Sequence, residues 1–135
     1  MIVLFVVRMS GDRLLDTCIL IDFLRGKAQA RTFLLGLNQI PYLSALTVAE
    51  LYGGVREGEE RTKLDRLLPL FHVVPVSAEI ATKGGLYRRQ YHKSHGVGLV
   101  DALIAATAED IGAVVVTLNK KHFPMISRLC VPYSA

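Results

Sequence analysis

The segment GLVDALIAATAEDIGAVVVTLN, residues 98–119, carries a helix and a strand one directly after the other. Apolar residues recur at helical spacing over residues 99–111, and Gly112 follows them as a stop signal. The β-branched run 113–117 then predicts a buried strand. Such a succession is typical of βαβ units, which build a parallel sheet. Asp101 conflicts with this pattern, because a carboxylate in an apolar run costs free energy unless something pairs with it.

The same alternation of strands and helices continues along the chain. Strands are predicted at residues 13–16, 40–45, 71–76, 113–117 and 129–131. Helices are predicted at residues 17–26, within 27–37, around 47–55, through Leu64, Leu67 and Leu68, from the N-cap Ser77 to about His92, and over 99–111. We therefore expect one α/β domain over residues 1–135. Its central, mainly parallel sheet of four to five strands is covered by helices on both faces, as a three-layer α/β/α sandwich.

The composition favours a compact fold and leaves the partner open. With 51% hydrophobic and 21% charged residues among 135, the chain has enough apolar side chains for a core. The formal net charge of +4 permits a polyanionic partner, but solubility alone also explains it. Cys18 and Cys130 stand at no spacing typical of metal binding or of a disulfide framework. That pattern favours a reducing cytoplasm.

The chain opens with MIVLFVVRM, whose apolar run covers only residues 2–7. This run is too short to span a bilayer, and it lacks the basic start and the small-residue cleavage site of a signal peptide. We therefore expect no membrane association. Residues 1–8 form an extra edge strand, or they precede the true start of the protein at Met9, and the sequence leaves both interpretations open.

Four oxygen-bearing side chains lie next to the predicted carboxyl ends of strands. They are Asp16 after the first strand, Glu50 in the helix after the second, Asp101 at the start of its helix, and Asn119. Sites in open parallel sheets form beyond the carboxyl ends of the strands, so we expect the four side chains to converge. Taken singly, Asp16 also suits a helix cap and Asp101 the first turn of a helix. Asn119 also suits a turn, and Glu50 an exposed position.

The chemistry of these four side chains indicates a metal ion. Grouped carboxylates repel one another, which raises their pKa values until a cation binds. Oxygen ligands without His or Cys beside them select Mg²⁺ or Mn²⁺. Such an ion activates water and stabilises the charge on a phosphodiester as it breaks. Asp16, Glu50, Asp101 and Asn119 therefore predict a site for one metal ion, and a second ion would depend on the phosphate oxygens of the substrate.

At these residues the chain resembles a PIN domain, and most of all the VapC-type toxins of prokaryotic toxin–antitoxin pairs. The resemblance extends from Leu14 to about Ile126. Its anchors are LLDTCILIDFLRG (14–26), SALTVAELYGGV (44–55), GLVDALIAATA (98–108) and VVVTLNKKHF (114–123). It implies the PIN fold and a metal-dependent endoribonuclease that acts as a toxin. It also implies a homodimer and a small cognate antitoxin that inserts a side chain into the active-site groove.

The resemblance also implies roles for single residues. Asp16, Glu50 and Asp101 would hold Mg²⁺ or Mn²⁺, and the family's fourth acidic position falls at Asn119. Many members carry Asp there, so Asn119 lowers the negative charge of the site. Thr117 matches a family hydroxyl that lies near the attacking water.

The substrate contacts and two other functions stay open at this stage. Lys120 and Lys121 follow Asn119 and are candidates to contact a substrate phosphate. The basic stretch 87–95, with its tyrosines, fits RNA binding, although a charged helix face explains it as well. A second enzyme interpretation keeps the metal but takes DNA or a small phosphoester as substrate. A third interpretation, which Asn119 favours, is an inactive module that binds RNA or an antitoxin.

Overall fold

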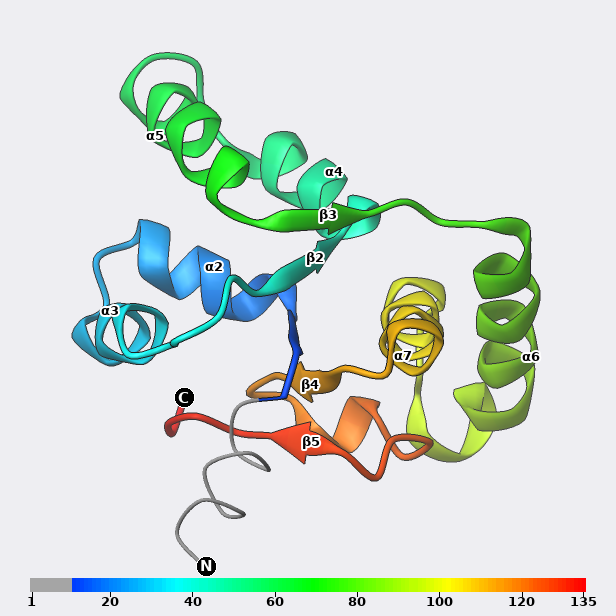
Figure 1. Ribbon diagram of the computed structural model, residues 1–135. Coiled ribbons are helices and arrows are strands. Elements are labelled where there is room, and N and C mark those ends of the chain that lie inside the picture. The colour runs from blue at the N-terminus through cyan, green and yellow to red at the C-terminus, as the bar shows by residue number, and fades with distance from the viewer. Residues whose placement is uncertain (1–10) are drawn as a thin grey trace, which may run out of the picture.

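The structure, a computed structural model, describes residues 11–135, which form one α/β unit around a five-stranded sheet (Figure 1). The strands are β1 (Arg13–Leu15), β2 (Tyr42–Ser44), β3 (His72–Val74), β4 (Val114–Val116) and β5 (Leu129–Cys130). Neighbouring strands are parallel, in the order β3-β2-β1-β4-β5. The predicted α/β class and parallel sheet are confirmed. The two interpretations of residues 1–8 concern a segment outside the described residues.

Within residues 11–135, six α-helices and two short 3₁₀ helices connect the strands. They are α2 (Thr17–Leu24), α3 (Ala28–Leu35), α4 (Ala45–Gly54), α5 (Glu59–Leu67), η1 (Leu68–Leu70), α6 (Ala78–His95), α7 (Leu99–Ile111) and η2 (Lys120–His122). Residues predicted from the sequence to start and stop helices lie at the ends of α6 and α7. Ser77 caps α6 by accepting from the N–H of Ile80 at 3.1 Å, and Gly112 ends α7 at a left-handed φ of 69°. None of the helices in this described part has the length and apolar character needed to cross a membrane.

Successive strand residues face opposite sides of the sheet, which produces two apolar layers. Leu15 and Val116 are fully buried on the side that α2, α3, α4 and α5 cover. Leu14 and Val115 are fully buried on the other side, against α7 and α6. Figure 1 shows α6 and α7 together on one side of the sheet and α2 with α3 on the other. The predicted α/β/α sandwich is confirmed, and burial on both faces explains why β4 is a continuous apolar run.

The register of β1 with β4 brings two distant segments together at the carboxyl edge of the sheet. The last pair in this register is Leu15 with Val116. The next residues, Asp16 and Thr117, therefore leave the sheet side by side. The N–H of Asp16 still donates to the carbonyl of Val116 at 2.8 Å. Because β2 lies on the other side of β1 and is also parallel, α4 begins at the same edge.

α6 and α7 approach each other most closely where Gly84 lies against Leu103. A Cβ at Gly84 would come within 2.5 Å of Leu103 Cδ2 and 3.1 Å of Leu103 Cα. The neighbouring Gly85 is exposed, and a Cβ there would meet nothing within 4 Å. Both glycines lie inside a helix, where glycine is unfavourable, but only Gly84 is required by the packing.

We expect Gly84→Ala to lower the free energy of unfolding by about 1–3 kcal/mol, because the added methyl group overpacks the contact with Leu103. Gly85→Ala is the matched control, and it should be neutral or stabilising by up to about 1 kcal/mol, since alanine favours the helix. Urea denaturation followed by circular dichroism measures both. Equal stability of the two variants would contradict the close packing of α6 on α7.

Candidate active site

Asp16 connects β1 to α2 and is 6% exposed. Its Oδ1 accepts a hydrogen bond from the N–H of Thr17 at 2.8 Å, which caps the helix. Its Oδ2 accepts from the hydroxyl of Thr117 at 2.7 Å. The explanation of Asp16 as a helix cap is therefore correct, and the same carboxylate also lies at the edge of the sheet where the site was predicted.

Glu50 reaches the same edge from α4. It is exposed, but its Oε1 accepts a hydrogen bond from the hydroxyl of Thr17 at 2.6 Å. Thr47 of the same helix is fully buried, and its hydroxyl oxygen lies 3.2 Å from that of Thr17. Thr17 thus ties the start of α2 to α4 and fixes Glu50 beside the residue that follows Asp16.

Asp101 lies in the first turn of α7 and is partly buried. Burial raises the pKa of its carboxyl above the ordinary value, and the charges of Asp16 and Glu50 raise it further. His122 acts in the opposite direction, since its Nδ1 lies 3.3 Å from Asp101 Oδ2. Asp16 and Glu50, from separate segments, therefore lie close enough to Asp101 to affect its ionisation.

Asn119 contributes to this edge through its backbone. Its N–H donates to Thr117 Oγ1 at 2.9 Å, and that hydroxyl in turn donates to Asp16. The Asn119 side chain is exposed immediately before η2, and Lys120 and Lys121 are exposed within η2. The sequence predicted Asn119 at this edge through its side chain, but it did not reveal that the backbone N–H of Asn119 orients the Thr117 hydroxyl.

Sequence reasoning missed Thr17 and His122. Thr17 follows Asp16 directly, and only the packing of α2 beside α4 reveals that its hydroxyl binds Glu50. His122 follows Asn119 by three residues, which is one turn of a 3₁₀ helix. That spacing was a usable signal, because it returns His122 to the end of β4 where the carboxylates lie.

Cys18 lies next to the carboxylates but does not suit the role of a nucleophile. Its Sγ is 3.7 Å from Asp16 Oδ2. Burial, followed by the charge of Asp16, raises the pKa of the Cys18 thiol to about 11. A thiol that stays protonated at neutral pH is a weak nucleophile. The reactive chemistry of this edge is therefore that of its oxygen atoms.

The donor chemistry of the three carboxylates fits a hard divalent cation. Burial, followed by the charge of Asp16, raises the pKa of Asp101, and a bound cation would stabilise the ionised carboxylate. In the part of the chain that the structure describes, no three His, Cys, Asp or Glu side chains already form a group that could hold an ion. Glu50 is the exposed member of the three, and Thr17 holds its carboxylate at this edge of the sheet.

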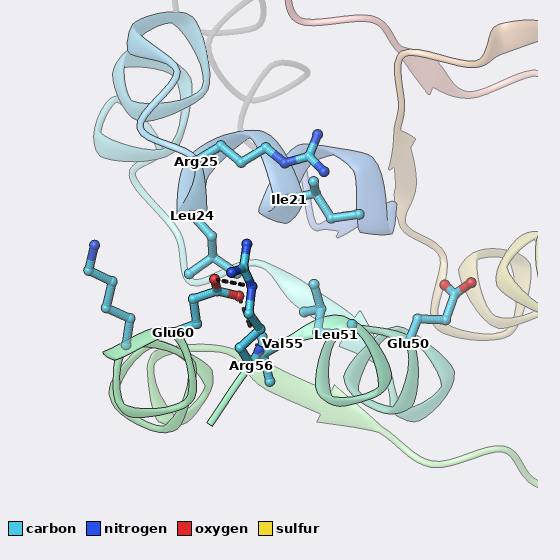
Figure 2. A pocket seen from close by; sticks show the side chains of 10 residues that line it. Ile21, Leu24, Arg25, Glu50, Leu51, Val55, Arg56 and Glu60 are labelled. Atoms are coloured by element: carbon cyan, nitrogen blue, oxygen red, sulfur yellow. Dashed lines mark hydrogen bonds and ion pairs between the residues drawn. The ribbon is translucent and has the colours of Figure 1, made fainter. Parts of the chain in front are cut away.

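A pocket of about 510 Å³ opens beside Glu50, between α2, α4 and α5. Its apolar lining comes from Ile21, Leu24, Leu51 and Val55. Figure 2 shows Glu50 at one end of the pocket, with its carboxylate turned away from the ion pair of Arg56 and Glu60 at the other end. The pocket and the group of carboxylates therefore share Glu50.

The family model of the PIN domain matches residues 13–129, a range that contains all the site residues described above. This chain belongs to the PIN-domain family. The ribonucleases VapC10 and VapC19 of Mycobacterium tuberculosis are each 41% identical to this PIN domain. Each alignment covers 90% of this chain, with 92% of VapC10 and 99% of VapC19. The family expected from the sequence is confirmed.

Solved structures agree with this PIN fold. A toxin–antitoxin complex from Klebsiella pneumoniae contains a chain that is 27% identical and superposes with a TM-score of 0.80, over 92% of this chain and 100% of that one. FitAcB from Neisseria gonorrhoeae is 29% identical with a TM-score of 0.71, over 89% of this chain and 97% of that one. The PIN domain is therefore similar to a chain of a solved toxin–antitoxin complex and to FitAcB.

In buffer without divalent cations, Asp101→Asn should make the PIN domain more stable than the wild type at neutral pH. The pKa of Asp101 is raised in the folded state, so its ionisation destabilises the fold. This cost is absent below the ordinary pKa of 3.8 and develops as the pH rises through the raised pKa. The Tm difference, measured by circular dichroism, should therefore be positive at neutral pH and disappear in acid. A variant less stable than the wild type at neutral pH would contradict the coupling of the carboxylates.

Proposed function

We propose that this PIN domain is a metal-dependent endoribonuclease and the toxin of a toxin–antitoxin pair. The main support is the electrostatic coupling of Asp16, Glu50 and Asp101, which come from separate segments and affect the same pKa. Carboxylates gathered in this way suit a hard cation and phosphodiester hydrolysis. The similarity to relatives named ribonuclease VapC10 and VapC19 supports RNA as the substrate class.

In this proposal Asp16, Glu50 and Asp101 hold Mg²⁺ or Mn²⁺, and Asn119 supports the ion with an amide oxygen. When bound, such an ion supplies an activated water and stabilises negative charge on the phosphate. The protein orients the ligands beforehand. Thr117 donates to Asp16, and the backbone N–H of Asn119 fixes the Thr117 hydroxyl, so the Asp16 carboxylate is held in one orientation. We therefore assign Thr117 the role of orienting Asp16.

The RNA backbone would approach along the exposed start of η2, where Lys120 and Lys121 are available to contact phosphates. The basic stretch 87–95 is a weaker candidate, because Tyr87 is already used within the fold. Its hydroxyl donates to Glu109, which also pairs with Lys83 at 2.6 Å. These contacts join α6 to α7 and favour the interpretation of this stretch as a charged helix face.

We expect Asp101→Asn to lower Mg²⁺-dependent RNA cleavage by more than about 100-fold. The loss of a metal ligand should lower activity at least as much as the loss of a residue that only hydrogen-bonds to such a ligand. Asp110→Asn is the matched control, since Asp110 is exposed at the far end of the same helix. Cleavage of a labelled RNA measures both variants, and circular dichroism checks their fold. Full activity of Asp101→Asn in a preparation free of other nucleases would rule out this site.

Two other functions give different results in related assays. A DNase or a general phosphodiesterase would cleave single-stranded DNA or a small phosphodiester in preference to RNA. An inactive binding module would cleave none of them and would show little affinity for Mn²⁺ by calorimetry. Asn119 in place of an acidic residue is the observation that favours this last function.

We further propose that the cognate antitoxin binds in the pocket beside Glu50. The apolar lining suits a helix or an extended segment of a partner, and a basic side chain of that partner would pair with the carboxylates beyond Glu50. The similarity to a chain of the Klebsiella pneumoniae toxin–antitoxin complex supports such a partner. A short reading frame next to the gene, encoding a DNA-binding protein, is the place to find it.

Gly54→Trp should weaken inhibition by the antitoxin about tenfold or more and leave RNA cleavage intact, because the indole would fill the pocket. A Cβ at Gly54 or at Gly53 meets nothing within 4 Å, so both positions are open to a side chain, and circular dichroism checks that each variant is folded. Gly53→Trp is the matched control, since Gly53 is not among the residues that line the pocket. Titration of the purified antitoxin into the cleavage assay measures the effect. A loss of cleavage with unchanged inhibition would assign the pocket to the RNA instead.

We also propose that the protein is a homodimer that acts in the cytoplasm, where RNA and Mg²⁺ are available. Support for a protein-covered surface comes from an apolar groove between α2, α3 and η1. Leu35, Ile40 and Leu70 line this groove and are 70%, 53% and 64% exposed. Exposed apolar side chains gathered in one place are typical of a protein–protein contact. Light scattering on the purified protein measures its mass directly.

A further inference from the structure

His122 lies beside the carboxylates and has no role in the function proposed so far. It is the last residue of η2, and its side chain is 35% exposed. Its Nδ1 lies 3.3 Å from Asp101 Oδ2, and this is the only ion pair of Asp101 within residues 11–135. The contact therefore reaches one of the two oxygens of a predicted metal ligand.

Backbone and core contacts anchor the segment that carries His122. The N–H of His122 donates to the carbonyl of Asn119 at 2.9 Å, which closes the turn of η2. The next residue, Phe123, is 2% exposed and packs in one cluster with Ile104 and Ala108 of α7. Since α7 also carries Asp101, the same packing that anchors η2 fixes the distance between the His122 ring and the Asp101 carboxylate.

The segment that leaves β4 thus reaches two carboxylates. Thr117 donates to Asp16 at its start, and His122 meets Asp101 at its end. We propose that His122 is a positioning residue for Asp101: the contact of its Nδ1 with Oδ2, at 3.3 Å, holds that oxygen and leaves the other directed to the cation. This inference rests on the proposed function, because it assumes that Asp101 is a metal ligand. Outer-shell partners of this kind fix the orientation of the ligands that bind the metal.

A purely electrostatic role for His122 predicts the opposite change in metal affinity when the ring is removed. If its only effect were to bring positive charge near the carboxylates, it would repel a cation, and its removal would strengthen metal binding. A neutral imidazole with its proton on Nδ1 orients Asp101 without that repulsion. The change in metal affinity on removing the ring therefore separates the two roles.

The experiment compares Mn²⁺ affinity, read from the electron paramagnetic resonance signal of free Mn²⁺, among variants of the full-length protein. His122→Ala should weaken Mn²⁺ binding by about 10–100-fold. His122→Asn should restore it, because the amide nitrogen of Asn occupies the position of Nδ1. His122→Gln, whose amide nitrogen corresponds to Nε2, should not. His95→Ala is the control, since His95 is exposed at the end of α6.

The outcomes separate this inference from the function on which it depends. If the wild type binds Mn²⁺ more tightly than Asp101→Asn but His122→Ala binds as tightly as the wild type or more so, only the positioning role is overturned. Failure of His122→Asn to restore binding overturns it as well. If the wild type binds Mn²⁺ no better than Asp101→Asn, the proposed metal site fails and the positioning role fails with it. Thermal melts confirm that each compared variant is folded.

Discussion

Leu15 pairs with Val116 in the central parallel pair of strands, and the site begins one residue later, with Asp16 beside Thr117. A slip of one residue in this register would turn the buried side chains of a strand to the opposite face of the sheet. The core contacts on both faces therefore hold the register, and the register in turn holds the hydrogen bond between Thr117 and Asp16. Packing far from any reactive atom thus sets the geometry of the first carboxylate.

The same edge gathers negative charge, which opposes folding. Burial raises the pKa of Asp101, and the charges of Asp16 and Glu50 raise it further. Several features offset part of this unfavourable charge. Asp16 and Asp101 lie at the starts of α2 and α7, where the helix dipole favours negative charge. The Asp16 carboxylate accepts hydrogen bonds from the N–H of Thr17 and the hydroxyl of Thr117, and Asp101 has His122 beside it. A group of carboxylates whose unfavourable charge is partly offset in this way is typical of a site that binds a cation.

Much of the fold was visible in the sequence because its signals are local. Apolar runs, the cap residue Ser77 and the stop residue Gly112 identify the elements and their ends within a few residues. The positions of Asp16, Glu50 and Asp101 were found because polar residues after buried strands must lie at one edge of a parallel sheet. Their exact surroundings were not visible. No local pattern indicated that the backbone N–H of Asn119 binds the Thr117 hydroxyl, or that Asp16, which suited a helix cap, also accepts from Thr117.

By itself, the sequence determined the α/β class, the order of the elements and the residue types that meet at the carboxyl edge, since these follow from periodicity and from the parallel topology. Only the tertiary structure decided which atoms meet. The bond from Thr17 to Glu50 depends on how α2 packs beside α4. The contact of His122 with Asp101 depends on Phe123 being buried against α7. Such contacts join residues far apart in the chain, so packing of the folded core, and no local pattern, fixes them.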